Sequence, residues 1–360
     1  MRQAASLLEL AAQRASDASV LLKLATVRRS MGDLSGAMQA AAAAVELAPR
    51  NFLMATLLGS LREATGAIHA AERAYRVACA AAPLDLSFKP AIAKQLARAR
   101  KRVDAVEDWR RRLLSWEPDQ LPGLTHPEQR RLRQFRTNIL ENLDAGPIAP
   151  PVFLLPGIRP ERYFDPREFP GVTDVERHTD AIREEFLAVV RTMDSKLAAK
   201  LAGAHSGDAA GGRPSGWSMI PLIRNGRVVE EFAGRCPVTM RLAAALEMPR
   251  LGLISPSLYF SVLAPGARIA PHTGITNARV IAHFPLIVPP NCGFRVGGET
   301  RPWVPGTAMI FDDMNVHEAW NDSDANRVVL IADLWRPELS TREREGVEML
   351  MDCGDAAVET

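Results

Sequence analysis

The feature that most constrains the fold of this chain is a 34-residue period in its first third. Small or apolar residues recur at this interval, and a proline closes each unit, the third one residue late. The positions are Ala37, Ala71 and Ala105; Ala25, Gly59 and Ala93; Leu24, Leu58 and Ile92; and Pro49, Pro83 and Pro118. Small residues let paired helices pack closely, and a proline ends a helix because it has no backbone N–H to donate. Residues 1–120 are therefore predicted to form stacked pairs of helices.

This period, with small residues at fixed places and a terminal proline, resembles the tetratricopeptide repeat. The match covers small and apolar positions only, since Leu21 and Ala55 replace the aromatic residue of the first helix. An irregular helical bundle is the alternative. Stacked helical pairs form a concave binding surface, and His69 is the one histidine of residues 1–120. We expect these repeats to recruit a peptide or protein substrate and to do no chemistry.

The pattern changes beyond residue 120. Residues 121–150 are expected to be a linker, because turn formers cluster at both ends of one helical segment near 127–143. From 151 to 340, short apolar runs alternate with Pro, Gly and Asn turns, which predicts an all-β barrel or sandwich. Helical spacing of apolar residues predicts one helix within 174–202. Residues 341–360 are expected to be a C-terminal tail.

Composition limits the classes of partner. With 24% charged residues and a formal net charge of +2, nothing requires a nucleic acid or a membrane, and no apolar run reaches the roughly 18–20 residues of a membrane span. The four cysteines form no CxxC pair, which fits a reducing compartment and a cytoplasmic location. The basic stretch 89–136 could bind nucleic acid, but a solvated helix face with Trp109 and Trp116 in the core is the preferred interpretation.

Two histidines, His272 and His317, each lie at the edge of a strand-like run. Two imidazoles on adjoining strands can bind one divalent metal from the same side and leave several positions open. The usual third ligand, a carboxylate two residues after the first histidine, is here Gly274. Arg327 opens the next strand, and an arginine there can hold a carboxylate of a small bound acid.

The run from Arg279 to Phe284 is predicted to be a strand. Alternate side chains of a strand share a face, so Arg279, Ile281 and His283 are expected to point together. An arginine and a histidine on an inward face are costly unless they are partnered. If that face is inward, it indicates an anionic ligand in the barrel; a polar outer face is the alternative.

The order of strands, histidines and arginine fits a double-stranded β-helix, a cupin-like jelly roll. The expected fold class is thus α+β multidomain, with an all-α repeat region before the jelly roll. The region from 151 to 339 resembles the aspartyl/asparaginyl β-hydroxylase family of iron- and 2-oxoglutarate-dependent oxygenases. The matching motifs are Pro271-His272-Thr273-Gly274, Thr276-Asn277, Arg279, His283, Ile310-Phe311-Asp312-Asp313, His317-Glu318, Trp320 and Asp333-Leu334-Trp335-Arg336-Pro337-Glu338-Leu339.

The resemblance implies roles for individual residues. Iron would have two protein ligands, with water in the position that a carboxylate fills elsewhere. The implied site residues are His272 and His317 for Fe(II); Ser261, His283 and Arg327 for 2-oxoglutarate; and Arg279 and Trp217 for the substrate. Ile281 stands where the family often carries a second arginine, which leaves part of the cosubstrate or substrate contact open.

The expected reaction is hydroxylation of an unactivated C–H bond with Fe(II), 2-oxoglutarate and O2. The first expectation for the substrate is the β-carbon of Asp or Asn in a peptide or protein. Three alternatives stay open: the same chemistry on a free amino acid, a lipid or a natural product; a non-catalytic binding protein in which the repeats act alone; and a metal-dependent isomerase or another cupin activity.

Overall fold

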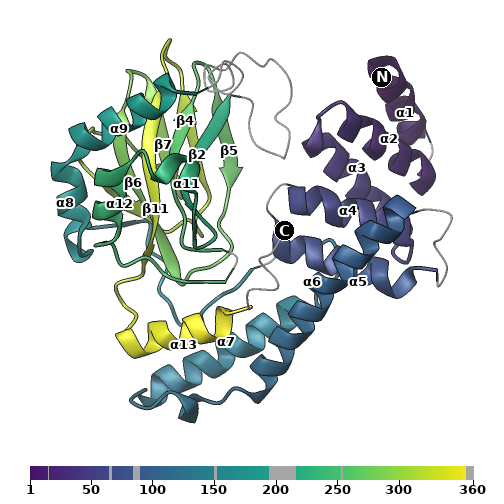
Figure 1. Cartoon of the computed structure of the whole chain (residues 1–360), viewed down its shortest axis with the longest axis horizontal. Coiled ribbons are helices and arrows are strands. Elements are labelled where there is room, and N and C mark those ends of the chain that lie inside the picture. The colour runs from purple at the N-terminus through teal and green to yellow at the C-terminus, as the bar shows by residue number, and fades with distance from the viewer. Residues whose placement is uncertain are drawn as a thin grey trace.

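The computed structural model of this chain describes residues 1–14, 16–64, 67–83, 90–149, 152–193, 216–252 and 254–353. A helical part at the N-terminus and a part with two antiparallel sheets at the C-terminus lie apart, and three helices join them below (Figure 1). The fold class is therefore confirmed as a helical region followed by a β-sheet domain. In the parts of the chain described here, none of the helices combines the length and apolar composition that crossing a bilayer requires.

The N-terminal helices pack as neighbours in sequence order. They are α1 (Arg2–Arg14), α2 (Ala18–Ser30), α3 (Leu34–Leu47), α4 (Phe52–Ala64) and α5 (Ile68–Ala81). The most extensive contacts join α2 to α3 and α4 to α5, as expected for two repeat units. The repeated small residues lie where these helices approach, since Ala37 and Ala71 are fully buried. A Cβ atom on Gly59 would lie 2.4 Å from the ring of Tyr75, so only glycine fits there.

The third repeat unit differs from the prediction. Instead of two helices, the chain forms one helix of 26 residues, α6 (Pro90–Ser115). In the first unit, Gly32 adopts a positive φ of 83° and turns the chain between α2 and α3. The equivalent position 34 residues later is Gly66, but 34 further on it is Arg100. Without a turn-forming residue there, the two predicted helices of the third unit continue into each other.

The C-terminal domain consists of two antiparallel sheets. The seven-stranded sheet has the order β1 (Tyr163–Phe164), β9 (Met309–Phe311), β6 (Arg279–Ile287), β11 (Arg327–Trp335), β4 (Leu258–Leu263), β2 (Trp217–Arg224) and β3 (Arg227–Val228). The four-stranded sheet has the order β5 (Arg268–His272), β10 (His317–Asn321), β7 (Cys292–Val296) and β8 (Glu299–Arg301). From β4 to β11 the chain passes back and forth between the sheets, which is the topology of a double-stranded β-helix.

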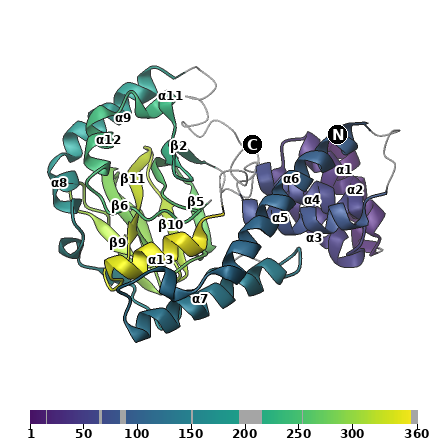
Figure 2. The same ribbon diagram turned by 60° about the horizontal axis from the view of Figure 1, so that its bottom comes forward.

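The two faces of the large sheet are buried in different ways. One face packs in an apolar core with helices α8 (Val172–Arg177), α9 (Thr179–Arg191), α11 (Glu230–Ala233) and α12 (Pro237–Ala243). The other face packs against the small sheet. Strands β5 and β10 of the small sheet lie on the side of the domain that faces the repeats (Figure 2). Alternate residues of β11 divide between the two cores: Leu330 packs under the helices, and Ile331 faces the small sheet.

Several elements differ from their sequence-based predictions. Residues 152–155, at the start of the predicted all-β region, form only an isolated bridge in which Phe153 pairs with Thr276. The helix expected within 174–202 is divided at His178 into α8 and α9, and residues 194–202 lie outside the described part. Helices α11 and α12 were not predicted; they are four and seven residues long, too short for a helical period to stand out.

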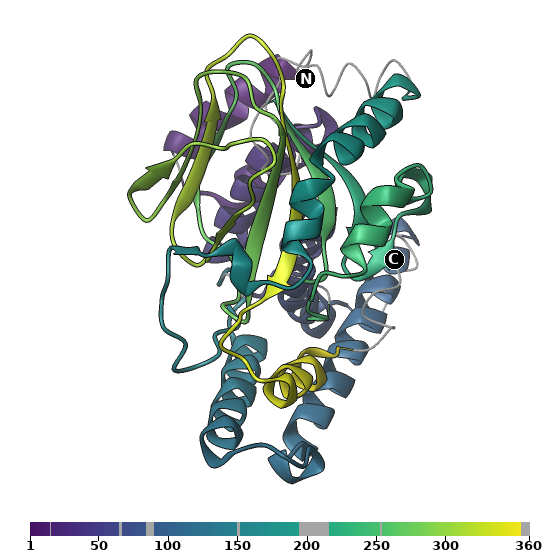
Figure 3. The same ribbon diagram turned by 90° about the vertical axis from the view of Figure 1, so that its left-hand side faces the viewer.

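The predicted linker and tail are part of one core with α6. The linker contains α7 (His126–Asp144), after the short 3-10 helix Pro118–Gln120, and residues 341–351 form α13 rather than a tail. α13 lies beside α6 and α7 below the sheets (Figure 3). Trp109 and Trp116 are both buried in this core, and the indole N–H of Trp109 donates to the carbonyl of Leu350 at 2.9 Å. The two tryptophans therefore serve packing, as the preferred interpretation predicts.

Candidate active site

The two candidate metal ligands face each other across the small sheet. His272 ends β5, His317 begins β10, and the two are direct partners in the antiparallel pair. Their ring centroids are 4.1 Å apart. The next pair in register is Ile269 with Ala319, so β5 has one more residue than β10 between the two pairs. This bulge turns both Ile269 and His272 towards the cavity between the sheets.

Backbone carbonyls orient both imidazoles. Nδ1 of His272 lies 2.8 Å from the carbonyl oxygen of Ala270, and Nδ1 of His317 lies 3.0 Å from that of Asn315. Since a carbonyl can only accept, each Nδ1 carries the proton and each Nε2 keeps its lone pair. Burial, and then the nearby His272, lowers the pKa of His317 to about 4, which keeps it neutral. Both rings are thus prepared to ligate through Nε2.

Gly274 leaves room for a carboxylate from another strand. A Cβ atom at this position would lie 2.2 Å from Oδ2 and 2.6 Å from Oδ1 of Asp313, so the Asp313 side chain already fills that space. The backbone N–H of Gly274 also donates to the Asp313 carbonyl at 2.6 Å. Asp313 is buried, and its Oδ1 has no hydrogen-bond partner among the described residues. A buried acceptor without a donor beside two histidines fits a metal-bound water.

Arg327 is a buried cation without a carboxylate. Its side chain is 1% exposed, its Nη1 donates to the Ser261 hydroxyl at 3.3 Å, and its guanidinium lies 4.7 Å from the Trp303 ring centroid. Among the described residues it forms no salt bridge, and its buried Nε has no acceptor. Burial lowers the pKa of Arg327 to about 10. A buried guanidinium in this state requires an anion, so its surroundings fit a small-molecule carboxylate.

His283 and Ser261 offer hydrogen-bond donors beside Arg327. The indole N–H of Trp303 donates to Nδ1 of His283 at 3.2 Å, so the neutral ring carries its proton on Nε2. Burial, and next the charge of Arg327, holds the pKa of His283 well below its ordinary value. The Ser261 hydroxyl accepts from Trp217 at 2.9 Å and from Arg327, which leaves its own hydrogen to donate. Both groups suit an anionic ligand.

Arg279 is already paired within the protein. Its Nη1 donates to Oδ2 of Asp313 at 3.0 Å, and its Nε lies 3.7 Å from Oδ1 of Asp333. Asp333 in turn accepts from Ser255 at 2.6 Å and from the backbone N–H of Ser257 at 2.8 Å. Burial opposes the charge of Arg279, but the two carboxylates more than offset it and raise its pKa. Burial raises the pKa of Asp313.

One cavity of about 210 Å³ brings the candidate residues together. All seven sequence-predicted site residues line it: Trp217, Ser261, His272, Arg279, His283, His317 and Arg327. Reasoning from sequence did not single out Asp313, Asp333 or Trp303 for the site. The two aspartates belong to motifs that read as strand ends, and nothing around Trp303 in the sequence indicates that it contacts His283.

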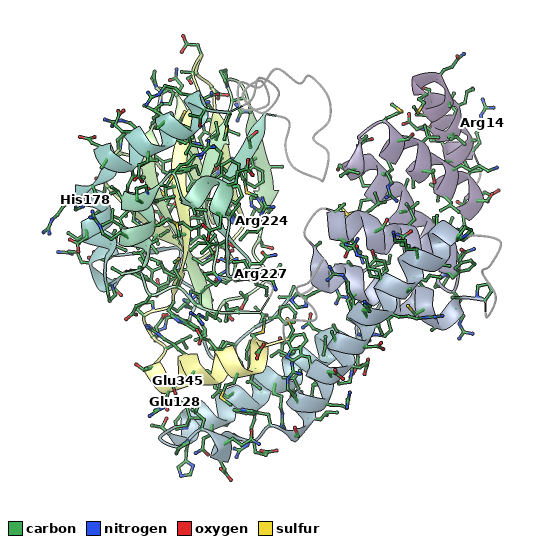
Figure 4. The ribbon with its side chains drawn as sticks, viewed as in Figure 1. Arg14, Glu128, His178, Arg224, Arg227 and Glu345 are labelled. Carbon is green, nitrogen blue, oxygen red and sulfur yellow. The ribbon has the colours of Figure 1, made fainter. Side chains whose placement is uncertain are left out.

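The remaining described histidines lie outside this cavity. His178 projects from the helical side of the sheet domain, while Arg224 and Arg227 project from the side that faces the repeats (Figure 4). His69 lies against the rings of Trp109 and Phe153, and burial lowers its pKa to about 4. Within the described ranges, no group of three His, Cys, Asp or Glu side chains is arranged as metal ligands.

Comparison with known proteins gives a consistent result for the sheet domain. Residues 176–337 match the family model described as aspartyl/asparaginyl beta-hydroxylase. The mouse aspartyl/asparaginyl beta-hydroxylase is 33% identical over 197 residues, which cover 53% of this chain and 25% of that protein. The aspartate beta-hydroxylase domain-containing protein 2 of Xenopus tropicalis is 31% identical over 211 residues, 57% of this chain and 55% of that protein.

Similarity to solved structures is weaker. A Pseudomonas putida prolyl-4-hydroxylase structure shares 17% identity with a TM-score of 0.26, covering 41% of this chain and 86% of that one. The matched region of this chain spans about a quarter of the mouse protein and about half of the Xenopus protein.

Proposed function

We propose that this chain, whose residues 176–337 match the family model described as aspartyl/asparaginyl beta-hydroxylase, is an Fe(II)- and 2-oxoglutarate-dependent hydroxylase. The observation that carries the proposal is one cavity in which two imidazoles with free Nε2 atoms share space with a buried guanidinium that has no carboxylate partner among the described residues. When bound, iron and 2-oxoglutarate supply the activation of oxygen that hydroxylates a C–H bond.

The residues of the chain have separate tasks in this reaction. His272 and His317 would hold the metal through Nε2, because their Nδ1 protons are tied to backbone carbonyls. Arg327 would bind the distal carboxylate of 2-oxoglutarate, with hydrogen bonds from the Ser261 hydroxyl and Nε2–H of His283. Oδ1 of Asp313 would accept a hydrogen bond from water at the metal. Aromatic side chains around this end of the cavity limit access of bulk water.

The proposed substrate is a side chain of a peptide or protein, at the β-carbon of Asp or Asn. The names of the related proteins support this class of substrate. The position of β5 supports a large substrate, since this strand lies on the side of the sheet domain that faces the repeats (Figure 1) and ends at the exposed His272. We propose that the helical repeats, of the tetratricopeptide type, recruit it. All four cysteines are free thiols, and a cytoplasmic location is part of the proposal.

The test is removal of each ligand with a matched histidine as control. His272→Ala and His317→Ala should abolish succinate formation from 2-oxoglutarate and should remove Mn(II) binding followed by electron paramagnetic resonance. His178→Ala should leave both unchanged, because this exposed histidine lies outside the cavity. Full succinate formation in either ligand variant would contradict the assignment.

A further inference from the structure

We infer that the side chain which this enzyme presents to the metal is uncharged, with the amide of asparagine as the best fit and aspartate excluded. The inference rests on the proposed function and narrows its substrate. It follows from two observations on the cavity: both arginines among its described lining residues have an anionic partner once the cosubstrate is bound, and isoleucines form much of the remaining lining.

The charges of the loaded cavity balance without a substrate. Fe(II) carries two positive charges and 2-oxoglutarate two negative ones. The two buried guanidinium groups, Arg279 and Arg327, are matched in number by two buried carboxylates, Asp313 and Asp333. At the rim, Glu318 is paired with Arg295 through a 2.7 Å hydrogen bond. A substrate carboxylate would therefore enter as an excess negative charge.

Arg279 cannot easily change partners to receive that carboxylate. It contacts both Asp313 and Asp333, and the strand pairing holds Asp333 opposite Ile281 on the neighbouring strand. Asp333 is further fixed by Ser255 and the backbone of Ser257. Releasing the guanidinium for a substrate anion would leave buried carboxylates without their counter-ion, which is unfavourable.

Much of the remaining lining is hydrocarbon, beside the hydroxyl-bearing Ser257 and Tyr259. Four isoleucines from four different segments line the cavity: Ile254, Ile269, Ile281 and Ile331. Ile281 lies on β6 between Arg279 and His283 and points the same way. It is only half-buried, so its side chain presents an apolar surface to whatever enters. A charged group against this surface would lose its hydration without a compensating partner.

An amide suits the polar atoms that do remain. The two carboxylates beside the cavity, Asp313 and Asp333, are acceptors. Oδ1 of Asp313 has no hydrogen-bond partner among the described residues, and its two lone pairs can accept from a substrate as well as from water at the metal. The NH2 group of an asparagine side chain can donate to such oxygens. A substrate carboxylate of the same shape can only accept, and its charge would be repelled.

The experiment is an affinity selection that needs no turnover. The full chain, loaded with Mn(II) and 2-oxoglutarate under nitrogen, is incubated with peptides whose central residue is Asn, Asp or Leu and whose flanks are randomised. Mass spectrometry measures the peptides captured. We expect Asn peptides to exceed Asp peptides by at least about tenfold. Equal or greater capture of Asp peptides, or no capture above that of His272→Ala, would overturn the inference.

A variant with an added positive charge in the cavity provides the second test. Ile281→Arg places an unpaired cation on the same strand face and should shift capture towards Asp peptides by about tenfold or more. Val228→Arg adds the same charge at an exposed edge strand outside the cavity and should leave the Asn preference unchanged. Thermal melting and Mn(II) binding verify that Ile281→Arg is folded; if it is not, the selection with the unmodified chain decides.

Failure of the proposed function would look different. A chain that is not an oxygenase of this type would fail to bind Mn(II) with 2-oxoglutarate and would form no succinate under air. A chain that does both but captures Asp peptides at least as well as Asn peptides would keep the proposed function and reject the uncharged substrate.

Discussion

A side chain at position 274 would compete with the carboxyl group of Asp313 for the same space. We predict that Gly274→Asp lowers the melting temperature, because overpacking a filled site typically costs about 1–3 kcal/mol, and lowers succinate formation at least tenfold by displacing Asp313. The control is Gly146→Ala, where a Cβ meets nothing within 4 Å. Increased turnover in Gly274→Asp would show that a third protein ligand helps this site.

Arg327 should be required for binding of 2-oxoglutarate. Removing one partner of a buried, charge-assisted contact costs roughly 2–5 kcal/mol, so Arg327→Ala should raise the KM for 2-oxoglutarate by at least about tenfold. Arg268→Ala serves as the control, because its exposed side chain pairs with Asp322 outside the cavity. Steady-state succinate formation measures both. An unchanged KM would assign Arg327 a structural role.

The sequence predicts those site residues that lie on one face of a single strand. Arg279, Ile281 and His283 share a face because a strand alternates every second residue, and that face does line the cavity. The partners of these residues could not be predicted in this way. Asp313 reaches Arg279 and the space at Gly274 from a different loop, and that contact depends on the tertiary fold.

At the level of elements, the junction core of α6, α7 and α13 should carry much of the stability. Trp109→Ala removes a fully buried indole and its hydrogen bond to the Leu350 carbonyl, and should cost about 3–5 kcal/mol in the free energy of unfolding. Leu114→Ala, five residues later on the same helix, removes a side chain that is 62% exposed and should be nearly neutral. Chemical denaturation compares the two, and equal effects would contradict the assignment.

A second element-scale prediction concerns His69, which packs on Trp109 and Phe153. Burial depresses its pKa to about 4 in the folded chain. As the pH falls, the unfolded chain binds a proton at His69 before the folded chain does. The contribution of neutral His69 to the free energy of unfolding is therefore complete above about pH 6.5 and is lost as the pH falls towards 4. We expect His69→Phe to reduce this acid-induced fall in melting temperature. Identical profiles for both proteins would show that His69 contributes nothing to it.

The elements that the sequence predicts well have strong local patterns. The strand predicted from Arg279 to Phe284 is part of β6, and the strand expected from Arg327 begins there as β11. The prediction of a third helical pair is wrong because the small residues recur with the same period, but the glycine that would turn the chain is replaced by Arg100. α13 was missed because its role depends on packing against helices distant in sequence.

For the molecule as a whole, the test of recruitment is removal of the first repeat unit. A cut at residue 125 would expose the core that α6 shares with α7 and α13, so the shorter deletion 1–50 is preferred. This variant should keep succinate formation without substrate and should lose hydroxylation of a long substrate far more than that of a short peptide. Equal loss on both substrates would reject recruitment and leave the repeats a stabilising role.

The continuous helix α6 has a consequence for which residue of such a substrate can reach the candidate metal site. Its Leu96 packs with the repeats, and its Trp109 packs in the junction core beneath the sheets. At about 1.5 Å per residue, its 26 residues form a rod of about 39 Å. A hinge at Arg100 would have uncoupled the two parts. Without one, α6 holds the repeats at a fixed distance from the candidate metal site. If the repeats recruit a peptide as proposed, that distance would restrict which of its residues can reach the histidine pair.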